Sequence, residues 1–379
     1  MPAQEGRNGL AQLLGYNGRM HNDFMTFYVD PAWRREGQHT ALLYPFWGNT
    51  LDPSRTPLQH ALFERHSFDT SVYAITDVLA KADAVLMPYS HNVVRRCFPE
   101  LLQTCHEVAQ RAHIPLLVDA MSDVEVPIDL PNTFVLRWAG YRFLPHEHDI
   151  HLPPYADDLL EVFCDGKLSL RAKSERPIVA FSGWASMTLK QEVRSIVKEL
   201  PARLRGIFDT RYRSMKKGIF FRREAVAILR RSPLVETHFN VRSSYSAHTH
   251  TAEKPPKELQ QELVDNLLSS DYGLDARGDP NASTRLFEIA SLGRIPLIID
   301  TERCLPFSDT LDYSTFSLVV DFRDMHRLPE IVAQFHAGLT DAKFQEMQQN
   351  ARDAFVRYFR VDALMQNIIR ELRKRTLRS

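Results

Sequence analysis

The fold is decided by residues 82–120, which read ADAVLMPYSHNVVRRCFPELLQTCHEVAQRAHIPLLVDA. The apolar runs at 82–89 and 115–120 have the length and composition of buried strands. Between them, apolar side chains recur at spacings of three and four, which predicts an amphipathic helix over 93–112. The side chains that carry this repeat are Val94, Cys97, Leu101, Cys105 and Val108. A strand, a helix and a second strand in this order are typical of a parallel sheet.

The segments on either side extend the same alternation over most of the chain. Further strands are expected at 24–29, 40–46, 133–138, 177–183, 236–242 and 295–300. Further helices are expected at 190–200, 258–270 and 284–293. We therefore predict a first α/β domain over 1–165, a polar linker over 166–176 and a second α/β domain over 177–340. The tail at 341–379 is helical in pattern and is expected to pack back toward the first domain.

Composition excludes several classes of protein. The 379 residues are 44% hydrophobic, and 47 Lys and Arg balance 47 Asp and Glu, so the chain lacks the positive field of a general nucleic-acid binder. Four scattered cysteines without a Cys-x-x-Cys pair favour a reducing compartment. The first residues lack the apolar core of a signal peptide, and no apolar run is long enough to span a bilayer. We therefore expect a cytoplasmic protein.

The most informative segment for function is residues 270–307, SDYGLDARGDPNASTRLFEIASLGRIPLIIDTERCLPF. A loop through Gly278 leads into a helix that opens near Ser283, with Asn281 or Ser283 as its cap, and Gly293 stops the helix before a buried strand. The unpaired N–H groups and the partial positive charge of a helix N-terminus suit a phosphate or diphosphate.

Charged side chains surround the start of this helix. Arg277 and Arg285 flank it and could contact phosphate oxygens, and Glu288 lies on the same helical face as Thr284, where it could accept both hydroxyls of a ribose. The pattern predicts a nucleotide-diphosphate site. Spacing alone is equally compatible with a surface helix that carries an ordinary Arg285–Glu288 ion pair.

The order Arg-Gly-Asp, Asn, Ser, Arg-Leu-Phe-Glu, Leu-Gly-Arg-Ile-Pro and Leu-Pro-Phe in this segment closely resembles the exostosin-like glycosyltransferases, glycosyltransferase family 47. The segment at 222–242 resembles the bacterial branch of that family, and 73–89 resembles its first domain more weakly. Asp275 and Ala276 depart from the family's usual Cys-x-Pro before the Arg-Gly-Asp, which leaves the base or sugar preference open.

The resemblance implies a fold and a reaction. The expected fold is α/β, with two Rossmann-like domains facing across a cleft, the GT-B type, and a closing C-terminal helix. The expected reaction is an inverting transfer from a UDP-sugar without a bound metal or other cofactor. In related enzymes the helix equivalent to 284–292 holds the donor diphosphate and its Glu holds the ribose.

The absence of an Asp-x-Asp motif agrees with a site that uses protein donors instead of a metal to neutralise the diphosphate. The expected donor-binding residues are Arg277, Gly278, Asn281, Ser283, Thr284, Arg285, Glu288, Arg223 and Arg242. For Arg223 and Arg242, a solvated helix face and a strand-end charge are equally good explanations.

An inverting transfer needs a general base for the acceptor hydroxyl. His91, Asp119 and Asp123 follow predicted strands of the first domain and are the candidates, with a weak preference for Asp119. Each could instead be a loop or cap side chain.

Two histidine clusters leave three interpretations open. They contain His146, His148 and His151, and His248 and His250. The interpretations are a metal site, a cleft or hinge role, and a polar surface loop.

Basic residues gather at 203–231 and again near the C-terminus. They indicate a solvated face, peripheral contact with the anionic inner face of a membrane, or an anionic glycan acceptor.

Two functions follow from these observations. The first is an inverting glycosyltransferase that moves a sugar from a UDP-sugar to a saccharide or lipid-linked saccharide acceptor in surface polysaccharide or lipopolysaccharide synthesis. The alternative is a non-catalytic glycan- or nucleotide-binding subunit of a glycan assembly complex. A phosphoryl or sulfuryl transferase is disfavoured because the chain has no Gly-x-x-x-x-Gly-Lys loop.

Overall fold

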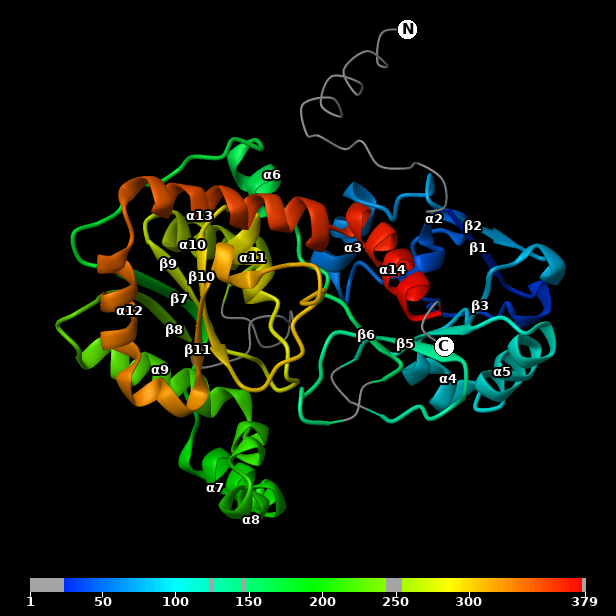
Figure 1. Ribbon diagram of the computed structural model, residues 1–379, viewed down its shortest axis with the longest axis horizontal. Helices are drawn as coiled ribbons and strands as arrows, with labels where there is room; N and C mark the ends of the chain where they lie inside the picture. Colours follow the sequence, from blue (N-terminus) through cyan, green and yellow to red (C-terminus); the bar gives the residue numbers. More distant parts are fainter. Residues whose placement is uncertain (1–23, 123–125, 145–146, 243–253, 377–379) are drawn as a thin grey trace, which may run out of the picture.

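The computed structural model describes residues 24–122, 126–144, 147–242 and 254–376. These residues form two α/β lobes, each built on its own parallel sheet (Figure 1). The prediction of two Rossmann-like domains is confirmed.

The first sheet has the strand order β2-β1-β3-β4-β5-β6, and every neighbouring pair is parallel. Its strands are β1 (Met25–Tyr28), β2 (Tyr73–Thr76), β3 (Ala84–Leu86), β4 (Leu116–Asp119), β5 (Thr133–Arg137) and β6 (Asp149–His151). Side chains of β3 and β4 are buried on both faces, as expected for the centre of a parallel sheet.

The second sheet has the order β11-β10-β9-β7-β8 and is also parallel. Its strands are β7 (Ile178–Trp184), β8 (Glu236–Arg242), β9 (Tyr272–Asp275), β10 (Ile295–Asp300) and β11 (Leu318–Asp321). Four strands of the two sheets, β2, β6, β9 and β11, are not identified by the sequence patterns. They are only three or four residues long, too short for periodicity to mark them.

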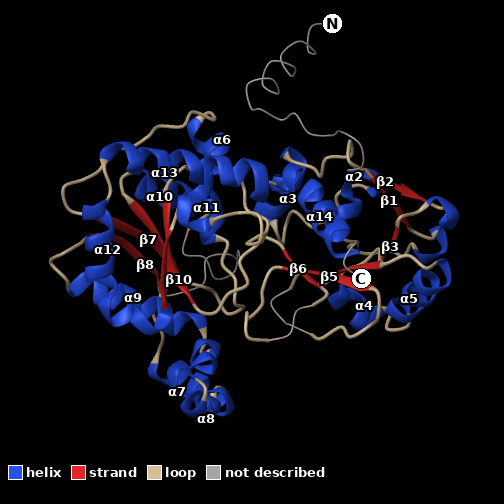
Figure 2. Cartoon of the chain, in the orientation of Figure 1, coloured by secondary structure: helices blue, strands red, loops and turns tan. Residues whose placement is uncertain are grey.

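Helices surround the two sheets (Figure 2). Those before the second sheet are α2 (Tyr44–Trp47), α3 (Pro57–Arg65), α4 (His91–Cys97), α5 (Leu101–Ala112) and α6 (Leu159–Cys164). The others are α7 (Leu189–Lys198), α8 (Leu200–Phe208), α9 (Gly218–Arg231), α10 (Pro256–Leu268), α11 (Arg285–Ser291), α12 (Leu328–Gly338), α13 (Asp341–Ala354) and α14 (Val361–Thr376). A π-helical turn, Phe355–Phe359, joins α13 to α14.

Two sequence expectations in the first domain are wrong. The apolar run at 40–46 is a 3₁₀ turn, Ala41–Leu43, followed by α2, and not a strand. Pro45 has no N–H for a sheet ladder but fits the first turn of a helix. The single helix expected at 93–112 is broken into α4 and α5, because Pro99 forces Phe98 out of the helical region.

The chain crosses between the domains at two places. Helix α6 falls within the predicted first domain, yet Leu159 and Leu160 pack with Leu263 of α10 and Ile289 of α11 in the second. Helix α13 lies on the second domain, and the buried side of α14 belongs to the core cluster of the first (Figure 1). Arg352 of α13 makes a two-pronged contact with buried Asp158, at 2.6 and 2.9 Å. The C-terminal helices therefore tie the two domains together.

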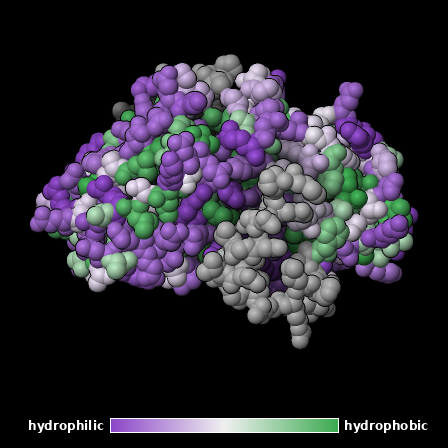
Figure 3. Space-filling view, turned by 90° about the horizontal axis from the view of Figure 1, so that it is seen from above, coloured by the Kyte–Doolittle hydropathy of each residue, from purple (hydrophilic) through white to green (hydrophobic). Residues whose placement is uncertain are grey.

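Seen from above, most of the described surface is hydrophilic, and hydrophobic side chains gather in limited areas (Figure 3). None of the helices in the described part of the chain has the length and apolar character needed to cross a bilayer.

Candidate functional site

Both sheets have a topological switch point, a place where the strands on the two sides of one central strand are reached by connections that run in opposite directions. In the first sheet β1 has β2 on one side and β3 on the other, and in the second sheet β7 has β8 and β9. Ligands of open parallel sheets bind at the carboxyl ends of the strands at such points. Donor and acceptor sites are therefore expected at the two switch points.

The carboxyl edges of the two sheets face each other. Tyr141, after β5, forms an isolated antiparallel bridge with Arg303, after β10. The Arg142 guanidinium contacts the Asp300 carboxylate at 2.8 Å, from one domain to the other. The strand ends of both domains consequently border one interdomain region, as the GT-B arrangement requires.

Arg285 and Glu288 lie at the switch point of the second sheet. Arg285 Nη2 donates to the carbonyl oxygen of Ser182 on β7 at 2.9 Å, although Arg285 itself belongs to α11, which follows β9. The Arg285 guanidinium is also 2.9 Å from the Glu288 carboxylate, and both side chains are partly exposed. The structure brings together these two predicted residues, here as an ion pair.

The loop before α11 differs from the expectation. The helix begins at Arg285 with Thr284 as its cap, and the exposed Thr284 side chain makes no capping bond, so neither Asn281 nor Ser283 caps it. Instead, buried Asn281 donates to the carbonyl of Gly140 in the first domain at 3.0 Å and to that of Thr301 at 3.1 Å. This loop therefore reaches the domain interface, where the Asn281 side-chain amide links the two domains by hydrogen bonds.

Arg277 is buried, and its guanidinium holds the loop through backbone carbonyls. Its guanidinium donates to the carbonyls of Asp279 at 2.9 Å, Ser214 at 3.0 Å and Lys216. The next residue, Gly278, packs so closely on Gly218 that no Cβ would fit at the start of α9. Arg277 thus anchors the 277–279 loop to the segment that leads into α9.

Arg223 and Arg242 are each held by a carboxylate. Arg223 of α9 contacts Glu192 of α7 at 2.9 Å, and Arg242 at the end of β8 contacts Glu262 of α10 at 3.1 Å. Neither contacts the Arg285–Glu288 pair in the described structure.

The neighbouring Arg222 lies at the second switch point, a position that the sequence does not reveal. Arg222 Nε donates to the carbonyl of Ala276, after β9, at 3.1 Å, and its Nη1 reaches that of Trp184, at the end of β7, at 3.4 Å. The side chain therefore spans the second switch point. Sequence reasoning selected Arg223 because the turn of α9 that faces the sheet cannot be read from a run of two arginines.

The base candidates lie at the carboxyl ends of adjacent strands in the first sheet. His91 is buried at the start of α4, and its pKa is lowered by burial and by the nearby charges of Arg95 and Arg137. Asp119 ends β4, accepts a hydrogen bond from Thr40 Oγ1 at 2.7 Å and one from the Met121 N–H at 3.0 Å. Burial raises the pKa of Asp119, and these two bonds oppose the shift. Asp123 lies outside the described residues.

Asp30 is a further carboxylate that sequence reasoning missed. It lies two residues after the end of β1, at the first switch point, and it is partly exposed. Its oxygens accept from the Ala32 N–H at 2.8 Å and from Tyr28 Oη at 3.0 Å. The sequence did offer a signal for Asp30, since it is a carboxylate that comes just after the first predicted strand.

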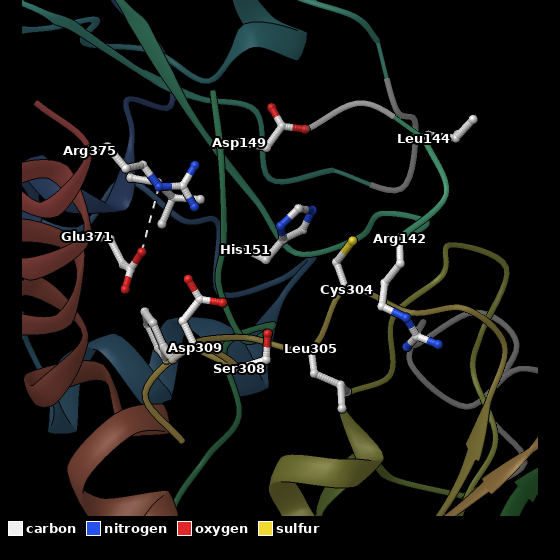
Figure 4. Close-up of a pocket in the computed structure, with 12 residues that line it drawn as sticks. Arg142, Leu144, Asp149, His151, Cys304, Leu305, Ser308, Asp309, Glu371 and Arg375 are labelled. Atoms are coloured by element: carbon white, nitrogen blue, oxygen red, sulfur yellow. Dashed lines mark ion pairs between the residues drawn. The ribbon is translucent and has the colours of Figure 1, made fainter. Parts of the chain in front are cut away.

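The histidine clusters are only partly described. His146, His248 and His250 lie outside the described residues, while the backbone carbonyl of His148 accepts from the Val135 N–H at 2.9 Å. His151 lines an interdomain cavity of about 420 Å³ between β6, the loop after β10 and α14 (Figure 4). Across the described ranges, no group of three or more His, Cys, Asp or Glu side chains is arranged to hold a metal ion.

Residues 213–335 match the exostosin GT47 domain. The exostosin-1 homolog of Caenorhabditis elegans is 28% identical over 110 residues, which cover 29% of this chain and 28% of the relative. A probable glycosyltransferase of Arabidopsis thaliana is 32% identical over 97 residues, covering 26% of this chain and 19% of the relative. The chain thus spans less than a third of the length of these curated relatives.

Two solved structures show weaker similarity. TarM is 8% identical with a TM-score of 0.35, covering 77% of this chain and 54% of TarM. A glycosyltransferase from Rickettsia africae is 10% identical with a TM-score of 0.35, covering 79% of this chain and 78% of that one. The family match lies within the second domain, over the segment that supplies Arg222, Arg285 and Glu288. The second domain of this chain therefore carries a segment, residues 213–335, that is similar to the exostosin GT47 domain.

Proposed function

We propose that this chain is an inverting, metal-independent glycosyltransferase that moves a sugar from a UDP-sugar to a saccharide acceptor in surface polysaccharide or lipopolysaccharide synthesis. The observation that carries the proposal is the coincidence of the exostosin GT47 segment with the second switch point. Within residues 213–335, Arg222 and Arg285 both reach the end of β7, from opposite sides of the switch. A parallel sheet binds its nucleotide at this point.

The donor would be held by charge and hydrogen bonding. Arg285 and Arg222 supply fixed positive charge for the diphosphate, which becomes more negative as the sugar departs. Glu288 is positioned beside Arg285 and offers carboxylate oxygens to ribose hydroxyls. Binding requires Arg285 to exchange part of its contact with Glu288 for phosphate oxygens. During this exchange, the hydrogen bond from Arg285 to the Ser182 carbonyl keeps the guanidinium near the carboxyl end of β7.

The acceptor side would be the carboxyl edge of the first sheet. A single displacement needs a base there, on the face of the sugar opposite the diphosphate. Asp119 is the first candidate because burial raises its pKa toward the value that suits proton transfer at neutral pH. His91, whose pKa is lowered, is neutral at that pH and is the second candidate.

Asp119→Asn is expected to lower turnover by about 10²-fold or more if this carboxylate takes the acceptor proton. The variant also has a stability signature. Because the folded-state pKa is raised, Asp119 contributes stability below the ordinary carboxyl pKa of about 4, and this is lost as pH rises through the folded value. Melting temperature measured from about pH 4 to 8 should therefore fall less with pH in Asp119→Asn than in wild type.

The matched control is Asp324→Asn, since Asp324 is exposed. It should follow the wild-type pH profile and retain turnover. Near-normal turnover of Asp119→Asn would remove Asp119 as the base, and an unchanged pH profile would contradict its buried, raised-pKa state.

A thermal-shift panel of UDP-, GDP- and CMP-sugars tests the donor class. A ligand that binds only the folded chain stabilises it by about 2.7 kcal/mol at a hundred times its Kd. We expect UDP-sugars to raise the melting temperature, with smaller effects from the other two classes. If no sugar nucleotide shifts the melting temperature, the donor assignment fails.

Release of UDP from a UDP-sugar in the absence of acceptor separates an enzyme from a binding subunit. Slow hydrolysis is expected of a glycosyltransferase. A strong thermal shift without any hydrolysis, and without transfer to saccharide acceptors, would instead support a nucleotide-binding subunit of a glycan assembly complex.

A further inference from the structure

Helices α7 and α8 form one kinked rod at the edge of the second domain, away from both sheets (Figure 1). Backbone bonds continue through the junction, where the Arg203 N–H donates to the Glu199 carbonyl at 2.9 Å. Pro201 lacks the N–H that an unbroken helix would use here, which explains the break between the two helices. The rod is therefore a projecting element rather than a cover for a sheet.

The rod turns its apolar side chains to solvent. Phe208 is 92% exposed, Ile207 66% and Val197 65%. The exposed apolar set, which we name the α7–α8 face, consists of Val193, Ile196, Val197, Leu200, Leu204, Ile207 and Phe208. Steps of three and four residues separate its members apart from two adjacent pairs, so they form one stripe along the rod. Single exposed apolar residues are ordinary in proteins, whereas a continuous stripe marks an interaction surface.

The opposite side of the rod, which contacts the protein, is small or polar. Ser195 and Gly206 are buried there, and the Gly206 carbonyl accepts from Arg213 Nε at 2.8 Å. Glu199 Oε1 accepts from the Lys217 N–H at 2.8 Å. An amphipathic helix of a water-soluble domain normally buries its apolar side. Here the polarity is reversed, since the members of the stripe are exposed among the residues that the structure describes.

Charge decides which partner fits this stripe. Residues 189–217 contain nine Lys and Arg and three acidic residues, in a chain with no net charge. Each of the three acids is paired with an arginine, Glu192 with Arg223, Glu199 with Arg203 and Asp209 with Arg211. A second copy of the same face would bring two strongly positive surfaces together, which is unfavourable. The complementary partner is an anionic surface.

We propose that the α7–α8 face binds the surface of an anionic lipid bilayer. The stripe enters the boundary between headgroups and acyl chains, while the surrounding Lys and Arg side chains contact lipid phosphates. A helix with one apolar side and a Lys- and Arg-rich polar side lies in the membrane interface in this way. The inference does not depend on the donor chemistry. It would place the chain on the surface from which a lipid-linked acceptor is presented.

Flotation with lipid vesicles tests the proposal on the full chain. We expect wild type to float with phosphatidylcholine vesicles that contain phosphatidylglycerol, more weakly at high salt, and not with phosphatidylcholine alone. The double variant Ile207→Glu and Phe208→Glu should bind the anionic vesicles at least about tenfold more weakly, since two apolar side chains no longer leave water. Val78→Glu, at a 43% exposed site in the first domain, is the matched control and should bind like wild type.

Melting temperatures identify any misfolded variant before flotation, and light scattering reports the oligomeric state. The proposal is overturned if wild type does not float with anionic vesicles, if it floats equally with both compositions, or if the double variant floats as well as wild type. A wild-type dimer that the double variant converts to a monomer would assign the face to a second copy and would equally overturn it.

Discussion

Arg285→Ala is expected to weaken UDP-sugar binding by about 10- to 100-fold, the range for losing a charge-assisted hydrogen bond to phosphate. Glu288→Gln should weaken it less, because an amide still accepts one ribose hydroxyl. Isothermal titration with UDP and with a UDP-sugar measures both effects. The ribose contribution is present in both ligands, so the loss in Glu288→Gln should be the same for the two.

Removing the ion pair also changes the helix itself, and this requires a matched control. Lys343 and Glu346 form a pair with the same three-residue spacing, at 2.8 Å, on α13. Lys343→Ala removes an equivalent helical pair, worth about 0.2–0.5 kcal/mol, at a distance from the switch point. It should leave UDP affinity unchanged. Equal affinity of Arg285→Ala, Glu288→Gln and wild type would show that the pair only stabilises α11.

Arg303→Met is expected to lower the free energy of unfolding by about 3–5 kcal/mol. Arg303 Nη2 contacts the Asp275 carboxylate at 2.6 Å, and both side chains are almost completely buried. Removing the arginine leaves a buried carboxylate without its counter-charge, in a place where water cannot solvate it. Denaturant unfolding followed by fluorescence measures the loss.

A neighbouring ion pair, between the two domains, supplies a control. Arg142 contacts Asp300 at 2.8 Å, but the Arg142 side chain is 46% exposed. Arg142→Met should therefore cost at most about 1 kcal/mol, as exposed ion pairs do. Adding Asp275→Leu to Arg303→Met should recover much of the stability, because the unpaired charge is gone. Similar losses in Arg303→Met and Arg142→Met would contradict the importance of burial.

The α/β alternation could be predicted from the sequence because strand and helix patterns depend on residues that are close together in the chain. Apolar strands and helical repeats predicted most of the longer elements, including β4, β7, β8 and β10, within one or two residues. The errors arose where one local pattern is compatible with either a strand or a helical turn. The run at 40–46 is apolar enough for a strand, but Pro45 and the burial of Leu42 and Leu43 favour a helical turn.

For the candidate site, the sequence named residues whose proximity follows from local spacing, but it could not show how each side chain is packed. It placed Arg285 and Glu288 together because a spacing of three residues on a helix fixes their proximity. It could not tell Arg222 from Arg223, since only the packing of α9 decides which one reaches β7 and β9. It also could not tell that Arg277 is buried among carbonyl groups.

By itself the sequence determined most of the longer elements, the α/β class with two Rossmann-like domains and the family resemblance, because these depend on residue types and spacings along the chain. Tertiary structure alone decided which strands are neighbours, where the switch points lie, and that α14 returns to the first domain. It alone decided that the apolar side of α7 and α8 faces solvent. A periodic pattern shows that a helix has an apolar side, whereas the direction of that side depends on residues distant in sequence, whose positions only the folded chain fixes.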